Sequence, residues 1–165
     1  TRLTDVTGVQ TCALPICLYR KFPGDLPLAL NIKSDGLQNE LSVLLERHRI
    51  WNYFVFDMSI PQHLQYIKSG VPSFSRQSEY EREPLLYEFS AGVWLDCFES
   101  EWFDMDTLRR HLEREKRVCL VSPELHHRDP SPCWEKIRTS GISSHDRFML
   151  CTDHPERARS YFDEQ

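Results

Sequence analysis

Residues Leu28 to Gly36 have the sequence LALNIKSDG, and this stretch decides the predicted fold. Apolar residues surround Asn31, the polar run Lys33 to Asp35 follows, and Gly36 then turns the chain. This pattern predicts a short buried strand with polar groups at its carboxyl end, followed by a helix from about Leu37.

The same unit recurs along the rest of the chain. The further copies are YFVFDMSIP, VPSFSRQSE, GVWLDCFES, VCLVSPELH and FMLCTDHPE. In each copy, an apolar strand leads into charged or hydroxyl-bearing residues and then into a helical stretch. A series of such units predicts a parallel sheet with crossover helices, in which the polar strand ends share one edge.

The apolar patterns also predict where the elements lie within one domain. After the first strand, strands are expected at 53–57, 71–76, 93–96, 117–122 and 148–151. Helices are expected from Leu37, from Pro61 to Gly70, in a short return over 79–90, from Asp104 or Asp106, after an N-cap at Ser131, and from Pro155.

Alternation within the strands predicts which side chains share a face. The predicted pairs are Asn31 with Lys33, Val55 with Asp57, Phe74 with Arg76, Trp94 with Asp96, and Leu120 with Ser122. If these faces point into a closed barrel, their polar groups converge at its carboxyl mouth.

The start of the chain differs from the rest. Residues 6–16 read VTGVQTCALPI, which matches the translation of a high-throughput sequencing adapter. We therefore exclude residues 1–16 from fold reasoning and expect a partial domain over 17–165, with the native sequence starting near Cys17.

Composition limits the classes of function. The chain has 165 residues, 40% of them hydrophobic, and a net charge of -5, which argues against a nucleic-acid partner or an anionic membrane surface. No apolar run is long enough to cross a bilayer. Cys97, Cys119 and Cys151 lie in or at the ends of predicted strands without C-x-x-C spacing. These cysteines are typical of reduced core thiols in a cytoplasmic protein.

Two short motifs carry a resemblance to a known family. They are Asn31-Ile32-Lys33, and Thr152-Asp153-His154-Pro155 followed by Glu156. With these motifs near the two ends of the repeated units, the chain resembles the glycerophosphodiester phosphodiesterase family. The family's motifs are Glu-Ile-Lys and Thr-Asp-x-Pro. The resemblance covers Leu28 to Phe162 and implies a (β/α)8 TIM-type barrel truncated at its N-terminus, with the third to eighth strand units present. A complete barrel has typically about 250 residues.

The resemblance implies metal-dependent hydrolysis of a small-molecule phosphodiester to an alcohol and a phosphomonoester such as glycerol phosphate. In the family, two histidines and a Glu-x-Asp pair in the first strand units perform acid–base catalysis and hold a divalent metal, Mg²⁺ or Ca²⁺. None of these residues has a counterpart here, so no catalytic residue is assigned, and we expect residues 1–165 alone to be inactive. The remaining family metal ligand falls at Asn31, whose amide oxygen can bind a hard cation but adds no charge.

An unclosed barrel is also expected to aggregate or to bind hydrophobic dyes.

Lys33 is the first candidate for binding the substrate phosphate. An unpaired ammonium on a buried strand is costly, so it should meet a phosphate or a carboxylate, and we favour the phosphate. The other candidates lie at predicted strand ends, and each alone also fits a loop salt bridge or a helix cap. They are Asp35, Asp57, Arg76, Glu79, Asp96 and Glu124.

Other interpretations stay open. Asn31 in place of the family's glutamate is compatible with a non-catalytic barrel that binds a phosphorylated or sugar-like ligand. Lys33 would also suit an imine in another barrel enzyme, such as an aldolase. His126 and His127 lack other ligands at metal-binding spacing, so solvated loop histidines are expected.

Overall fold

A computed structural model describes residues 26–163 of the chain. Within them the fold is α/β with parallel strands, as predicted, and the chain divides into two compact units. The first unit ends at Ser73 and the second begins at Phe74. The adapter-like stretch and Cys17 lie outside the described residues. None of the described helices is long and apolar enough to cross a membrane.

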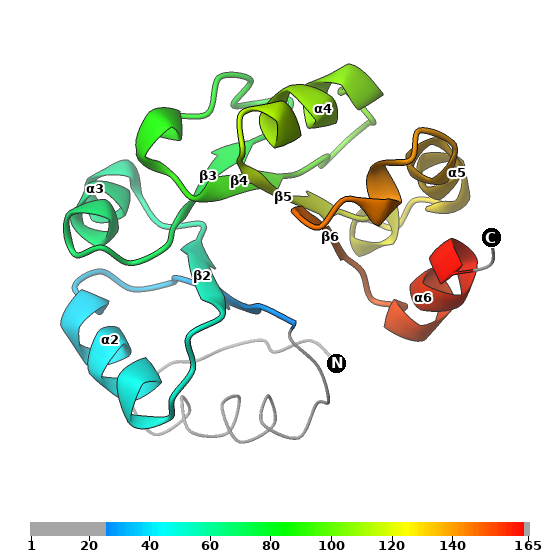
Figure 1. Cartoon of the computed structure of the whole chain (residues 1–165). Coiled ribbons are helices and arrows are strands. Elements are labelled where there is room, and N and C mark those ends of the chain that lie inside the picture. Colours follow the sequence, from blue (N-terminus) through cyan, green and yellow to red (C-terminus); the bar gives the residue numbers. More distant parts are fainter. Residues whose placement is uncertain (1–25, 164–165) are drawn as a thin grey trace. The chain divides into compact units, whose positions relative to one another are not determined.

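The first unit contains two parallel strands and two helices (Figure 1). They are β1 (Leu28–Asn31), α2 (Gln38–Arg47), β2 (Tyr53–Phe56) and α3 (Ile60–Lys68). Leu28 pairs with Tyr53 and Asn31 pairs with Phe56, so both strands end at the same level. The Val55 N–H also donates to the Pro72 carbonyl at 2.9 Å, which places the segment before Ser73 along the other side of β2.

The core of the first unit lies between these strands and the helices. Val55 and Tyr66 are completely buried there, and partly buried Leu30 packs against the same cluster. Val55 therefore faces the helices, and the prediction that it shares a face with Asp57 is wrong. The reason is that β2 ends at Phe56, after which Asp57 adopts a left-handed backbone with φ of 66° and interrupts the alternation.

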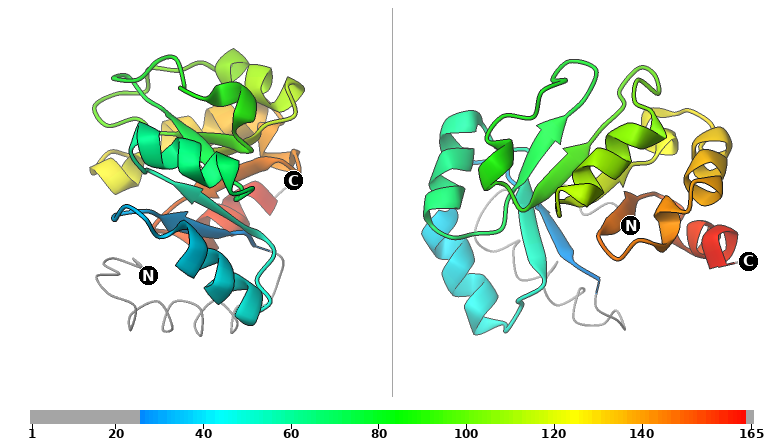
Figure 2. Two further views of the ribbon diagram at one scale, coloured as in Figure 1. Left: turned by 90° about the vertical axis from the view of Figure 1, so that its left-hand side faces the viewer. Right: turned by 45° about the horizontal axis from the view of Figure 1, so that its top comes forward.

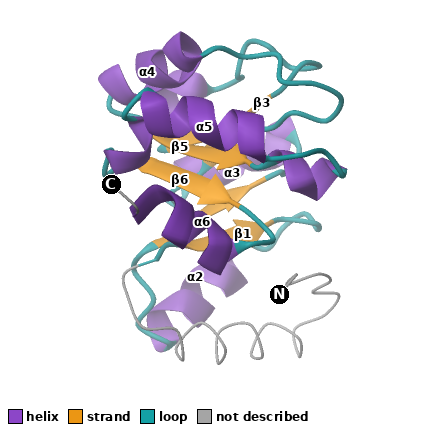
Figure 3. Ribbon diagram, turned by 90° about the vertical axis from the view of Figure 1, so that its right-hand side faces the viewer, coloured by secondary structure: helices purple, strands orange, loops and turns teal. Residues whose placement is uncertain are grey.

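The second unit contains four parallel strands in the order β3-β4-β5-β6. Its strands are β3 (Phe74–Gln77), β4 (Gly92–Leu95), β5 (Arg117–Val121) and β6 (Phe148–Cys151). Its helices are α4 (Met105–Glu113), α5 (Ser131–Thr139) and α6 (Pro155–Asp163). Figure 2 shows α4 beside the strands of this sheet, and Figure 3 shows α5 and α6 next to β5 and β6.

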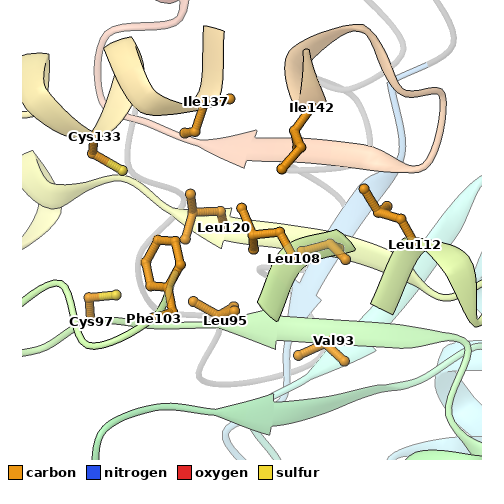
Figure 4. Close-up of a cluster of buried hydrophobic side chains, with 11 residues drawn as sticks. Val93, Leu95, Cys97, Phe103, Leu108, Leu112, Leu120, Cys133, Ile137 and Ile142 are labelled. Atoms are coloured by element: carbon orange, nitrogen blue, oxygen red, sulfur yellow. The ribbon is translucent and has the colours of Figure 1, made fainter. Parts of the chain in front are cut away.

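Helices and one face of this sheet enclose the larger core (Figure 4). Leu95 and Leu120 are opposite each other in the register of β4 and β5, and both point into this core. The predicted grouping of Leu120 and Ser122 with Trp94 and Asp96 is therefore wrong, because Leu120 lies on the helix-covered face. Cys119 is paired with Trp94 on the opposite face.

The described cysteines are free thiols, all in the second unit. Cys97, Cys119 and Cys133 are buried, and Cys151 is partly buried. Burial raises the pKa of Cys97 and Cys133 to about 12, and it raises the pKa of Cys119 well above its ordinary value. The predicted role of Cys97 and Cys119 as apolar core residues is confirmed.

The structure also corrects several predicted elements. The short helical return predicted over 79–90 is limited to a 3-10 turn at Tyr87–Phe89, which follows Leu86 with its left-handed φ of 57°. The third strand starts at Phe74 and not at residue 71. Ser131 is the first residue of α5 and not its N-cap, and the Asp129 carboxylate accepts the Ser131 N–H at 3.0 Å.

Candidate functional site at the carboxyl ends of the strands

At the carboxyl edge of the first unit, Lys33 and Asp57 form an ion pair. The Lys33 Nζ lies 2.5 Å from Asp57 Oδ2, and the two side chains are 63% and 30% exposed. The left-handed backbone at Asp57 makes this contact possible just after β2 ends. The expected buried ammonium is thus an exposed, paired one. The N-cap of α3 is Ser59, whose side chain makes no capping hydrogen bond.

Asn31 and Asp35 complete this edge as exposed residues. The loop that carries Asp35 is attached to α3, because the Gly36 N–H donates to Gln62 Oε1 at 3.0 Å. Burial, together with the negative charge of Asp35, raises the pKa of Tyr66 to about 12. Asp35 therefore acts electrostatically on a buried phenol of its own unit.

At the carboxyl edge of the second unit, the predicted site residues bind neighbouring loops. Arg76 pairs with Glu81 at 3.2 Å. Glu79 accepts the backbone N–H groups of Phe98 at 3.1 Å and Glu99 at 2.6 Å. Partial burial favours the neutral acid, but these backbone bonds outweigh it and lower the pKa of Glu79. Glu79 thus fixes the loop after β4.

Asp96 forms a pair that the sequence did not reveal. His126 Nε2 lies 2.7 Å from Asp96 Oδ1, and the same oxygen accepts the Cys97 N–H at 2.8 Å. The prediction that His126 is a solvated loop histidine is therefore wrong, whereas His127 is exposed as expected. The 3-10 turn Pro123–His126 brings the imidazole to Asp96, a contact across 30 positions that no residue spacing indicates.

Glu124 connects the ends of β5 and β6. Its carboxylate accepts the hydroxyl groups of Ser122 and Thr152, and the Asp153 N–H at 3.2 Å. The Trp134 Nε1–H donates to Ser122 Oγ at 2.8 Å and extends the network into the core. The Thr152-Asp153 motif thus has a structural role at this position.

The described residues do not form a site that fits a divalent metal. No group of three His, Cys, Asp or Glu side chains within residues 26–163 could hold one. Asn31 contributes no charge, and Lys33, two positions further on, adds a positive charge that disfavours a bound cation.

The two edges offer different chemistry. The first presents an exposed ammonium that an anion can approach, and the second presents an imidazole held by a carboxylate. Comparisons of the chain with protein-family models, with curated proteins and with solved structures found no match.

Proposed function

We propose that the chain is the carboxyl-terminal part of a (β/α)8 barrel of the glycerophosphodiester phosphodiesterase type, with β1 to β6 as its third to eighth strands. The observation that carries the proposal is Lys33, which lies exposed at the carboxyl end of β1 beside Asp57. An ammonium at the carboxyl end of a parallel strand is well placed to bind a phosphoryl oxygen.

Under this proposal, the chain contributes phosphate binding and not bond cleavage. The parent enzyme would hydrolyse a phosphodiester to an alcohol and a phosphomonoester. The acid–base histidines and the ligands for Mg²⁺ or Ca²⁺ would belong to the family's first two strand units. The free thiols of the described residues support a cytoplasmic location as part of the same proposal.

Asp57 is a competitor for the ligand in this arrangement. A phosphate ester must share or replace the carboxylate that lies 2.5 Å from Lys33 Nζ. Exposed ion pairs contribute less than about 1 kcal/mol, so this exchange is not costly. Removing the charge of Asp57 should therefore strengthen phosphate binding, while removing the charge of Lys33 should weaken it.

The test is a titration of the 165-residue chain with glycerol 3-phosphate, followed by NMR. Lys33→Met should weaken binding at least about tenfold, the loss expected for one charge-assisted hydrogen bond. Lys68→Met is the matched control, because Lys68 is an exposed lysine at the end of α3. Asp57→Asn should raise the affinity, and asparagine tolerates the left-handed backbone at this position.

Two results would contradict the proposal. Equal effects of Lys33→Met and Lys68→Met would show that Lys33 is not the phosphate-binding residue. Metal-dependent hydrolysis of glycerophosphodiesters by the pure chain would show that it carries catalytic groups of its own.

A second candidate is a non-catalytic barrel that binds a phosphorylated or sugar-like ligand. Asn31 favours it, because a neutral amide stands where the resembled family has a metal-binding glutamate. Such a binder would hold glycerol 3-phosphate equally well in Mg²⁺ and in a chelator. This comparison needs the parent protein with the family's first two strand units, because the proposed metal ligands belong to them. In that protein, tighter binding when Mg²⁺ or Ca²⁺ is added would exclude the non-catalytic binder in favour of the metal-dependent hydrolase.

A further inference from the structure

Three aromatic rings lie in a row at the carboxyl edge of the second unit. The ring centroids of Tyr80 and Phe98 are 6.0 Å apart, and those of Phe98 and His126 are 5.1 Å apart. Tyr80 is 68% exposed and Phe98 is 47% exposed. We call these three residues the aromatic row. They come from the segments after β3, β4 and β5.

Hydrogen bonds hold the aromatic row in place. The Phe98 N–H donates to the Glu79 carboxylate at 3.1 Å, which connects the segments that carry Phe98 and Tyr80. The Tyr80 hydroxyl donates to Glu99 in the same loop as Phe98. The exposed rings are thus preorganised, which reduces the entropy that a ligand loses on binding.

The Asp96 carboxylate determines which nitrogen of His126 carries a proton. Asp96 Oδ1 accepts the Cys97 N–H and lies 2.7 Å from His126 Nε2, so the Nε2–H donates to the carboxylate. In the neutral ring this leaves Nδ1 as the acceptor. Nδ1 has no hydrogen-bond partner among the described residues. It is not buried, so solvent reaches it.

Charge disfavours one class of ligand at this surface. Glu79, Asp96 and Glu99 place three carboxylates beside the aromatic row, against two guanidinium groups, those of Arg82 and Arg128, which bond the Glu79 and Cys97 carbonyls. The excess of negative charge disfavours phosphorylated and other anionic ligands. A neutral ligand with hydroxyl donors and an apolar face meets no such repulsion. The face of an aromatic ring is negative, so it attracts the slightly positive C–H groups on one face of a sugar ring.

We propose that Asp96, His126 and the rings of Phe98 and Tyr80 form a binding site for a neutral sugar ring. A ligand hydroxyl donates to His126 Nδ1, while the C–H face of the sugar packs on Phe98 and Tyr80. Asp96 is a positioning residue, because it acts through His126. All four residues belong to the second unit, whereas the residues of the phosphate-binding proposal belong to the first.

The probe is methyl β-D-glucopyranoside, added to the 165-residue chain and followed through the NMR signals of His126 and the aromatic rings. We expect saturable shifts of His126, Phe98 and Tyr80. Phe98→Leu should weaken binding about five- to tenfold, as expected for the loss of one aromatic contact. Phe89→Leu is the matched control, because Phe89 is 71% exposed and lies outside the aromatic row.

A second pair of variants tests the imidazole. His126→Gln keeps a donor that can reach Asp96 but replaces the ring acceptor, so binding should fall several-fold. His127→Asn, at the adjacent exposed histidine, should leave binding unchanged, since asparagine suits the φ of 59° at that position. Tyr80→Leu removes the other ring of the proposed site and should also weaken glucoside binding. Tyr80 is more exposed than Phe98, so this change should not cause misfolding.

The outcomes separate this site from the one at Lys33. Lys33→Met should leave glucoside binding intact, and glycerol 3-phosphate should not shift the His126 signals. Linear, non-saturating shifts, or equal losses in Phe98→Leu and Phe89→Leu, would overturn the sugar site whatever the result at Lys33.

Discussion

The carboxyl ends of the strands are arranged differently in the two units. In the first unit, Lys33 and Asp57 form an ion pair that solvent reaches. In the second unit, Glu79, Asp96 and Glu124 each accept at least two hydrogen bonds from neighbouring loops. The same residue types at equivalent strand ends are thus exposed in one unit and part of a network in the other.

This difference shows how to distinguish a ligand-binding charge from a structural one. A carboxylate whose oxygens already accept loop N–H and hydroxyl groups cannot exchange them for a ligand without loosening those loops. An exposed ion pair can exchange its partner at little cost. We therefore expect changes of the bonded carboxylates at the second edge to affect stability, and changes of the Lys33–Asp57 pair at the first edge to affect anion binding.

A fall in pH should have the largest effect on the stability of the second unit, through His111. Its Nε2 lies 2.8 Å from Gln77 Oε1, and its Nδ1 lies 2.9 Å from the Tyr87 hydroxyl. Burial, with the nearby charges of Arg110 and Arg114, lowers the pKa of His111 from 6.5 to about 4. The unfolded chain then binds this proton at higher pH than the folded chain. Stability should fall by about 3 kcal/mol as the pH drops from about 6.5 to about 4.

Urea unfolding at a series of pH values measures this slope. His111→Gln keeps a donor and an acceptor without titrating, and the difference between the two proteins isolates His111 from the carboxylates. Parallel curves for the two proteins would show that His111 does not contribute.

Gly92→Ala should have the next largest effect. A Cβ at Gly92 would lie 2.6 Å from a ring carbon of Phe74 and even closer to the backbone oxygen of Arg117. Overpacking of this kind costs about 2 kcal/mol. Unfolding followed by tryptophan fluorescence measures it, because Trp94, Trp102 and Trp134 lie in the second unit.

Gly70→Ala is the comparison in the first unit. A Cβ at Gly70 meets nothing within 4 Å, so the cost there is the left-handed φ of 71° alone. This strain is about 1 kcal/mol. A Gly92→Ala protein as stable as the natural one would show that the second core can adjust to the extra carbon.

Glu124→Gln should cost about 1 kcal/mol, because an amide replaces one of the two acceptor oxygens that hold Ser122, Thr152 and Asp153. Amide hydrogen exchange at Asp153 should become faster. Glu113→Gln, at an exposed position of α4, is the control and should change neither quantity. Unchanged exchange at Asp153 in Glu124→Gln would remove the assigned structural role of Glu124.

Lys33→Met should have the smallest effect on stability, below about 0.5 kcal/mol, since it removes one exposed ion pair. Thermal unfolding provides the measurement. A loss above about 1 kcal/mol would place Lys33 among the structural charges and remove the contrast between the two edges.

The sequence predicted much of the fold because apolar runs mark buried strands directly. The bounds of β6 at Phe148–Cys151 agree with the prediction, and Trp134 and Ile137 of α5 are completely buried as expected. The parallel arrangement followed from the alternation of strands with helices. These features depend on local pattern, which a single sequence contains.

The faces of the strands and the polar contacts could not be predicted in the same way. Asp57 departs from alternation because of one left-handed residue, and Leu120 lies on the helix-covered face because of the register between β4 and β5. The contact between Asp96 and His126 depends on a short 3-10 turn. Such features arise from backbone geometry between elements, which residue types alone do not determine.

The buried cysteines make the second unit suitable for measuring local opening by chemical labelling. Alkylating reagents react with the thiolate, and burial raises the pKa of Cys97 and Cys133 to about 12 and that of Cys151 to about 11. At neutral pH, iodoacetamide should therefore modify these positions mainly during transient opening of the structure. The labelling rate of each cysteine would then report the free energy of opening around it, without any engineered residue.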